Sequence, residues 1–157
     1  MNTTTDNPME LRVLQQNENA SDPLFQSEYA QQLLSIYAEY YVETGFQFPW
    51  VAYLIVDDGE VLGTVSFTKA PVDHTVEIAY WTSPDHEGKG VASFGCKEIV
   101  RIAVEADPSV TITAKTAPEI NPSTHILEKN GFRKVEVVQD DEIGDAWMWK
   151  YHGSGAE

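Results

Sequence analysis

The sequence predicts an α+β fold, with a mixed central sheet of about seven strands covered by helices. Three observations support this class. β-rich runs recur along most of the chain, two long stretches instead carry apolar residues at helical spacing, and a glycine-bearing turn joins one strand to a helix. The chain has 157 residues, of which 42% are hydrophobic, so it is long enough to bury one core and needs no second domain. We therefore expect residues 1–157 to form a single domain.

The N-terminal quarter predicts one strand and one long helix. Residues 1–9 are mostly polar and are expected to be disordered, and Leu11 to Leu14 alternates as a strand does. Ser21-Asp22-Pro23 supplies a cap and a first-turn proline for a helix that should reach about Val42 and end at Thr44-Gly45. The apolar stripe of this helix comprises Phe25, Tyr29, Leu33, Tyr37 and Tyr41, widened by Leu34, Ile36 and Tyr40.

Three antiparallel strands are predicted next. Trp50 to Val56 and Val61 to Thr68 flank the turn Asp57-Asp58-Gly59-Glu60, which indicates a hairpin. Thr75 to Thr82 forms a third strand after the turn Pro71-Val72-Asp73-His74.

The strand-like pattern stops in the segment from Ser83 to Gly90. From Val91 to Ala106 the apolar residues return to helical spacing, which predicts a long helix. Later elements are a strand, a short helix and a closing strand pair. They are expected at Val110 to Thr116, Asn121 to Lys129, Phe132 to Val138 and Ala146 to Tyr151, followed by a tail, 153–157, that should be disordered.

The composition excludes several classes of partner. A formal net charge of -15 repels polyanions, so nucleic acid is not expected. No apolar run is long enough to cross a bilayer, and the leader lacks the features of a secretory signal, which predicts a cytoplasmic protein with no membrane partner. Cys96 is the only cysteine, and the four histidines lack metal-ligand spacing, so neither a disulfide nor a metal is expected.

The turn between the predicted strand Thr75 to Thr82 and the predicted helix Val91 to Ala106 is the strongest candidate for a functional site. At a helix N-terminus the first backbone N–H groups lack helical partners and the helix dipole favours an anion. Gly88 and Gly90 would let a phosphate approach the main chain closely. Gly-x-Gly before a helix is most often only a tight turn, so this pattern carries weight only with its context.

That context is a resemblance to the GNAT superfamily of N-acetyltransferases. Glu87-Gly88-Lys89-Gly90-Val91-Ala92 fits the cofactor signature Q/R-x-x-G-x-G/A at every position but the first. The segment from Glu119 to Phe132 resembles the E-x-N-x-S-T-x-x-L-E-K-x-G-F block of the RimJ/RimL-like branch and lies at the expected distance downstream. The resemblance covers about Leu11 to Tyr151 and implies a GNAT-type acyl-CoA N-acyltransferase fold.

The resemblance also implies a cofactor site for acetyl-CoA. The main-chain amides from Gly88 to Ala92, and thus of Lys89, Gly90 and Val91, would bind its pyrophosphate. The strand end Tyr80-Trp81-Thr82 would pair through its backbone with pantetheine, in a wedge opened where this strand splays from Val110 to Thr116. For the side chains of Tyr80 and Trp81, core packing is at least as good an interpretation. Glu87 departs from the family, so we expect its side chain to turn away from the diphosphate, with Lys89 offsetting its charge.

Two residues are candidates for catalysis. Glu77 lies where several relatives place a carboxylate that removes the amine proton, although a strand carboxylate is as often merely solvated. The tyrosine with which many relatives protonate the leaving thiolate is replaced by Leu127. Ser123 matches a serine that approaches the cofactor sulfur in the RimJ/RimL-like branch, and helix capping is the alternative for Ser123 and for Asn121. The resemblance gives Asn121 a hydrogen bond to pantetheine or to the helix start.

The predicted function is transfer of an acetyl group from acetyl-CoA directly to a primary amine, either a protein N-terminus or a small amine, with no covalent acyl-enzyme. Cys96 lies on the apolar stripe of its helix and is a poor nucleophile. Two alternatives stay open: a module that senses acyl-CoA without turnover, and a transferase that uses a longer acyl-CoA. The oligomeric state is also open, and a homodimer is compatible with the sequence.

The charge distribution predicts a cationic acceptor. Up to Thr68 the only basic residue is Arg12, and in the family fold two acidic segments would flank the acceptor entrance. Their acids are Glu39, Glu43, Asp140, Asp141, Glu142 and Asp145, and the aromatic residues Tyr37, Tyr40, Tyr41, Phe46, Phe48 and Trp50 would add walls and cation–π contacts. The alternative is that the aromatics form core and the acids serve solubility.

Overall fold

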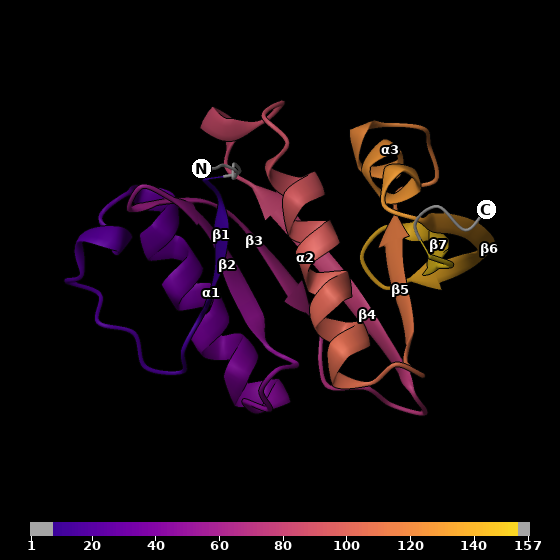
Figure 1. Ribbon diagram of the computed structural model, residues 1–157, viewed down its shortest axis with the longest axis horizontal. Coiled ribbons are helices and arrows are strands. Elements are labelled where there is room, and N and C mark those ends of the chain that lie inside the picture. The colour runs from indigo at the N-terminus through magenta and orange to yellow at the C-terminus, as the bar shows by residue number, and fades with distance from the viewer. Residues whose placement is uncertain (1–7, 154–157) are drawn as a thin grey trace, which may run out of the picture.

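The computed structural model describes residues 8–153 and shows three α-helices against one seven-stranded sheet (Figure 1). The expectations of disorder at 1–7 and 154–157 lie outside the described residues; Met9 packs against the core. The elements, in chain order, are β1 (Glu10–Val13), the 3-10 helix η1 (Pro23–Phe25), α1 (Glu28–Thr44), β2 (Ala52–Asp57), β3 (Glu60–Phe67), β4 (Thr75–Thr82), the 3-10 helix η2 (Pro84–His86), α2 (Val91–Ala106), β5 (Thr111–Thr116), α3 (Pro122–Lys129), β6 (Phe132–Asp140) and β7 (Gly144–Tyr151).

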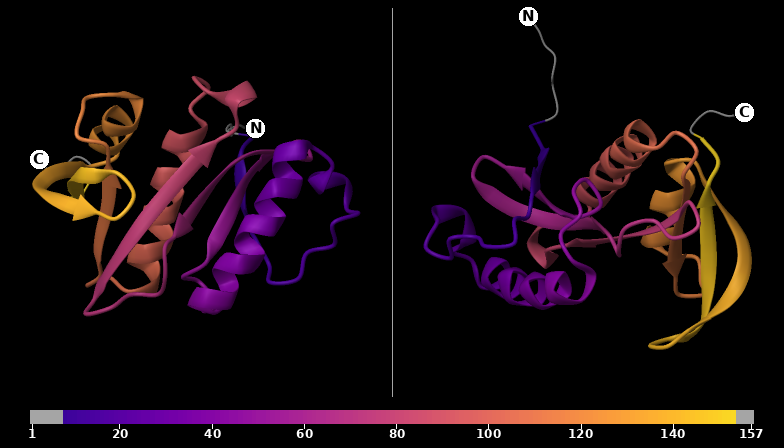
Figure 2. Two further views of the ribbon diagram at one scale, coloured as in Figure 1. Left: turned by 180° about the vertical axis from the view of Figure 1, so that it is seen from behind. Right: turned by 90° about the horizontal axis from the view of Figure 1, so that it is seen from below.

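The sheet has the strand order β1-β2-β3-β4-β5-β7-β6. Its strand pairs are antiparallel except for β4 and β5, which run parallel and are joined through α2. Helices cover both faces: α2 lies on one face and α1 on the other (Figure 2). The predicted α+β class and mixed sheet are therefore confirmed.

The N-terminal helix differs from the prediction, because it forms as two separate pieces. Asp22 caps only the single turn of η1, where its carboxylate accepts a hydrogen bond from the Leu24 amide at 2.9 Å. Ser27 then caps α1, accepting from the Ala30 amide at 3.2 Å. A second capping side chain five residues after the first ends one helix and begins the next. Phe25 is consequently buried from η1, and Ile36, expected on the stripe, is 58% exposed.

The C-terminal hairpin also differs from the prediction. Pairing between β6 and β7 continues through Gln139↔Asp145 to Asp140↔Gly144, so the loop between the strands is shorter than expected. Gln139, Asp140 and Asp145, which the sequence placed in that loop, are strand residues. Asp140 is held in place because its carboxylate accepts the Glu142 amide at 2.8 Å.

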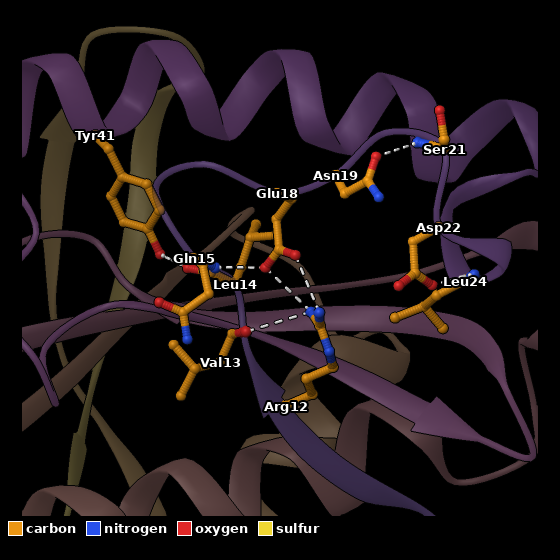
Figure 3. Close-up of polar contacts among 10 residues, drawn as sticks. All are labelled: Arg12, Val13, Leu14, Gln15, Glu18, Asn19, Ser21, Asp22, Leu24 and Tyr41. Carbon is orange, nitrogen blue, oxygen red and sulfur yellow. Dashed lines mark hydrogen bonds and ion pairs between the residues drawn. The ribbon is translucent and has the colours of Figure 1, made fainter.

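A buried tyrosine fastens α1 to the sheet. The Tyr41 hydroxyl donates to the Leu14 carbonyl at 2.7 Å and accepts from the Ala52 amide at 3.0 Å, which joins α1 to the segment after β1 and to β2. Close by, the Arg12 guanidinium forms a two-point ion pair with Glu18, at 3.0 and 3.1 Å, and Glu18 also accepts the Gln15 amide (Figure 3). These contacts hold the segment that connects β1 to the helices.

We expect Tyr41→Phe to lower the free energy of unfolding by about 1–3 kcal/mol, because it leaves a buried carbonyl and a buried amide each without one partner. Urea unfolding measures the change. Tyr37→Phe is the matched control: Tyr37 is on the same helix, and its hydroxyl has no hydrogen bond to another described residue. Equal losses in the two variants would show that the Tyr41 hydroxyl does not fasten the helix.

Candidate functional site

The sheet opens between β4 and β5. The two strands pair from Thr75↔Thr111 only as far as Ile78↔Ala114, although both continue further. The last four residues of β4, Ala79 to Thr82, pair with β3 on one edge, and on the other edge they have no strand partner in the described sheet. The wedge that the resemblance implied is thus present, and one edge of β4 is available to an extended ligand.

Gly63 allows β3 to approach the end of β4 closely. Gly63 pairs with Thr82, and a Cβ at this position would collide with the Trp81 carbonyl oxygen. Gly95 has the same function in α2, since a Cβ there would stand 2.6 Å from the Ile55 side chain. Gly63 therefore sets how closely β3 lies against the end of β4, and Gly95 sets how closely α2 lies against β2 and β3.

A cleft of about 660 Å³ extends from the wedge to the glycine turn. Its lining comes from the end of β4, the turn, the start of α2 and the start of α3. Of the predicted site residues it includes Tyr80, Trp81, Thr82, Glu87, Gly88, Gly90, Val91, Ala92 and Ser123. Lys89, Asn121 and Glu77 do not line it, and Lys89 lines a neighbouring cleft instead. Lys89 therefore does not share a cleft with Glu87.

The glycine turn adopts a backbone conformation that other residues rarely take. Gly88 and Gly90 have φ angles of 78° and 80°, in the left-handed region. Gly90 is the N-cap of α2, and the Phe94 amide donates to its carbonyl at 3.0 Å. The amides of Val91, Ala92 and Ser93 precede this bond, so they have no partner within the helix and lie at its positive end. The turn has the chemistry of an anion site.

His86 holds this turn against β3. Its ring lies between the Ser83 hydroxyl, to which Nδ1 is hydrogen bonded, and Glu60, whose carboxylate is 3.2 Å from Nε2. Sequence reasoning did not select His86. The cleft also includes Ser93, Pro122, His125, Ile126 and Lys129, which were not selected either. Pro122, His125, Ile126 and Lys129 all stand in the second motif block, so that block could have identified them.

Tyr80 and Ser123 meet inside the cleft. The Tyr80 hydroxyl is 3.0 Å from the Ser123 hydroxyl and 3.1 Å from the Ser123 carbonyl, and its one hydrogen can be donated to either oxygen. Burial raises the pKa of the Tyr80 phenol to about 12, partly countered by the hydrogen bond to Ser123. The cap of α3 is Asn121, which exchanges hydrogen bonds with Thr124 at 3.0 Å in both directions. Of the two open roles, capping therefore belongs to Asn121, and the Ser123 hydroxyl is not a cap.

Glu77 lies on the opposite face of β4 from Tyr80, because side chains alternate along a strand. Its carboxylate is 3.7 Å from the Lys115 ammonium, which is also 3.5 Å from Asp140. The hydrogen bond from the Glu142 amide lowers the pKa of Asp140, with further lowering from Ile143 and Lys115. The sequence did not predict Lys115, and it did not predict that these two carboxylates share one cation.

Most of the aromatic residues expected near the acceptor entrance pack into the core. The Tyr40 hydroxyl bonds to the Phe67 carbonyl, Trp50 stacks edge-on against the Phe67 ring at 4.9 Å, and Tyr37 and Phe46 also pack on the core. Phe48 is the exception and is 65% exposed. At the end of β4, Trp81 contacts Tyr29 of α1, with ring centroids 5.9 Å apart.

Several other chemistries lack a basis in the described residues. Cys96 is buried in α2, and burial raises the pKa of its thiol to about 12, so almost none is thiolate at neutral pH. Within 8–153 no group of three His, Cys, Asp or Glu side chains could hold a metal ion. None of the helices formed by these residues has the length and apolar character needed to cross a membrane.

Comparisons with known proteins agree with this architecture. Residues 3–133 match the family model described as "Acetyltransferase (GNAT) domain". A ribosomal-protein-serine acetyltransferase of Escherichia coli is 25% identical over 97 residues, 60% of this chain and 54% of that protein. An uncharacterized N-acetyltransferase, p20, of Bacillus licheniformis is 29% identical over 90 residues, 57% of this chain and 51% of that protein. The chain thus spans about half the length of these curated relatives.

Solved structures share the fold at low identity. A ribosomal-protein-S5-alanine acetyltransferase from Vibrio fischeri superposes with a TM-score of 0.67 at 15% identity and covers 98% of both chains. A spermidine N-acetyltransferase chimera from Vibrio cholerae and hSSAT gives 0.66 at 15% identity, over 92% of this chain and 95% of that one. The acetyltransferase MccE, solved with acetyl-CoA and AMP, gives 0.63 at 18% identity, over 77% and 70%.

Proposed function

The chain belongs to the GNAT acetyltransferase family, and from this premise we propose that it moves an acetyl group from acetyl-CoA directly to a primary amine. The observation that carries the proposal is the continuity of the cleft. One hollow joins the free edge of β4, the wedge beside β5 and the positive end of α2. A long ligand with an anionic part and an extended amide-bearing arm fits such a hollow.

The described residues offer acetyl-CoA three kinds of contact. The amides at the start of α2 face the cleft from a turn in which Gly88 and Gly90 leave room for a diphosphate. The backbone of Ala79 to Thr82 offers hydrogen bonds to a pantetheine arm along an edge without a strand partner. Lys129 brings a positive charge to the lining, which matters in a chain of net charge -15.

The two faces of β4 divide the chemistry. Tyr80 faces the cofactor cleft, and Glu77 faces the side covered by α1. In direct transfer, the amine nitrogen forms a bond to the acetyl carbon, the carbon–sulfur bond breaks, and the amine loses one proton while the departing sulfur gains one. Glu77 is the carboxylate we assign to the first proton. Cys96 is buried with its thiol protonated, which argues against an acyl-enzyme on this residue.

We further infer a cationic acceptor that approaches from the Glu77 face. α1 and the loop end of the β6–β7 hairpin both lie on the side of the sheet opposite α2 (Figure 2). Exposed carboxylates stand on both, at Glu39 and Glu43 on α1 and at Asp141 and Glu142 on the loop. Asp140 contributes less to this field than the sequence suggested, because Lys115 lies beside it. One structural relative is named as a spermidine N-acetyltransferase. Spermidine is a polycation, which supports this inference.

The test is release of free thiol from acetyl-CoA with a panel of monoamines, polyamines and peptides with a free N-terminus. We expect cationic amines to react best, and we expect kcat/KM to fall as salt rises from 0.1 M to 1 M, since the Debye length shrinks from about 10 Å to about 3 Å. Asp141→Asn with Glu142→Gln should reduce both kcat/KM and its salt dependence.

The same assay includes the outcomes that contradict the proposal. Tight CoA binding without thiol release from any acceptor would indicate a sensing module. Turnover that needs a longer acyl-CoA would change the donor. An acetyl group found on the protein by mass spectrometry during turnover would contradict direct transfer, and salt-independent kcat/KM would contradict electrostatic attraction of the acceptor.

We expect Gly90→Val to weaken CoA binding by more than about tenfold, because a side chain at the start of α2 obstructs the diphosphate and strains a backbone at positive φ. Isothermal titration with CoA measures this. Gly59→Val is the matched control: Gly59 has φ 76°, also faces open space, and lies in the β2–β3 turn outside the cleft. Both variants carry similar backbone strain, and only Gly90→Val should lose affinity. Equal CoA affinity in the two variants would contradict the assignment of the diphosphate site to this turn.

We expect Glu77→Gln to lower kcat by about 10²–10⁴, mostly at low pH where the amine must lose a proton, with CoA affinity unchanged. This substitution also removes the ion pair with Lys115. Asp140→Asn provides the control, since it removes the other carboxylate beside Lys115 and keeps Glu77. An ion pair at the protein surface contributes little, so Asp140→Asn should change kcat less than about fivefold. Equal losses would assign the effect to the charge network and not to a base.

A further inference from the structure

The Tyr80 side chain spans the wedge from β4 to α3. Its hydroxyl contacts both the carbonyl and the hydroxyl of Ser123, and both residues line the cleft. No strand pairing joins this part of β4 to its neighbour β5, so the contact links two walls of the cleft that the sheet itself does not connect. A link of this kind fixes the position of whatever lies at its far end.

Helix capping does not explain the contact between the Ser123 hydroxyl and Tyr80. The N-cap of α3 is Asn121, and the capping box is completed by Thr124. Among the described residues, the Ser123 hydroxyl has Tyr80 as its one side-chain partner. The phenol has one hydrogen and two acceptors within reach, the Ser123 carbonyl at 3.1 Å and the Ser123 hydroxyl at 3.0 Å. When the phenol donates to the hydroxyl, the single serine hydrogen is left for a third group, which in this cleft would be a bound ligand.

The phenol is a hydrogen-bond donor here and not a source of protons. Burial raises the pKa of Tyr80 to about 12, whereas an ordinary thiol has a pKa of about 8.5. A thiolate cannot remove a proton from so much weaker an acid to any useful extent. Tyr80 therefore keeps its proton throughout the neutral range, and its contribution is a fixed hydrogen bond.

We propose that Tyr80 is a positioning residue, whose hydroxyl orients the Ser123 hydroxyl so that its hydrogen points into the cleft toward the sulfur of bound acetyl-CoA. The inference rests on the proposed function. As the carbon–sulfur bond breaks, the electron pair stays on sulfur, and the oriented hydroxyl donates a hydrogen bond to it. Neither Tyr80 nor Ser123 changes its protonation state, and the thiolate takes its proton from water. This arrangement supplies a donor in a chain with Leu127 where relatives have a tyrosine.

The experiment compares Tyr80→Phe, Ser123→Ala and the double variant. We expect each single variant to lower kcat by about tenfold, the loss of one hydrogen bond, with little change in KM for acetyl-CoA. The double variant should lose no more than either single one, because both substitutions remove the same interaction. Tyr53→Phe is the matched control. The Tyr53 hydroxyl also donates to a carbonyl, that of Pro49 at 2.7 Å, burial also raises its pKa to about 12, and it lies outside the cleft.

A binding measurement tests the same contact without turnover. At alkaline pH an increasing fraction of the CoA thiol is ionised to thiolate, and desulfo-CoA lacks the sulfur. The unmodified protein should bind CoA about tenfold more tightly than desulfo-CoA, and Tyr80→Phe and Ser123→Ala should each bring this ratio close to one. A general structural defect would weaken both ligands equally and leave the ratio unchanged.

Two results would overturn the proposal. One is a Tyr80→Phe variant that keeps kcat and the affinity ratio while Ser123→Ala loses them. The other is additive losses in the double variant, which would show that the two residues act separately. Failure of the proposed function can be distinguished from failure of the Tyr80 proposal. If the unmodified protein binds CoA in preference to desulfo-CoA but transfers acetyl to no amine, the proposed enzymatic function is wrong, and the affinity ratio still tests the role of Tyr80. An unmodified protein that binds neither ligand contradicts both proposals.

Discussion

The parallel pairing of β4 and β5 ends after four residues, and the rest of the site depends on that interruption. Parallel strands normally stay buried and paired along their length. Here the two strands separate beyond Ile78 and Ala114, and α3 follows β5 at its far end. The separation leaves backbone groups of β4 without a strand partner on that edge, and the cleft extends along them to the glycine turn. A continuous ladder at this point would remove both features.

The strand alternation of β4 then assigns different chemistry to each face. Tyr80 points into the cleft beside α2 and α3, and Glu77 and Trp81 have the opposite parity along the strand. Trp81 contacts Tyr29 of α1 and also lines the cleft. Glu77 is connected through Lys115 to Asp140, so the C-terminal hairpin contributes to the electrostatics of the same face. In the proposed function, one strand with an ordinary period of two carries groups for a cofactor on one side and for an acceptor on the other.

Most of this arrangement could be predicted from the sequence, because the signals were local. The glycine turn and its motif predicted cleft residues on both sides of it, namely Tyr80 to Thr82, Glu87, Gly88 and Gly90 to Ala92, and the second motif block predicted Ser123. The predicted strand Thr75 to Thr82 matched β4 at both ends. The misses have physical reasons. Ser27 competes as a cap with Asp22, which sequence periodicity alone does not resolve. Lys115 meets Glu77 and Asp140 only after three separate strands are aligned, and Tyr80 meets Ser123 across 43 positions of sequence.

The close approach of β3 to β4 limits how such a chain can diverge. Gly59 and Gly63 belong to the same hairpin, four residues apart; Gly59 faces open space, and Gly63 faces the Trp81 carbonyl. A side chain at Gly59 strains only its own turn, but any side chain at Gly63 must displace the strand that forms the cleft wall. A substitution of Gly63 would therefore change the shape of the cleft. Gly63 thus restricts that shape although Gly63 itself lies in β3 and does not line the cleft.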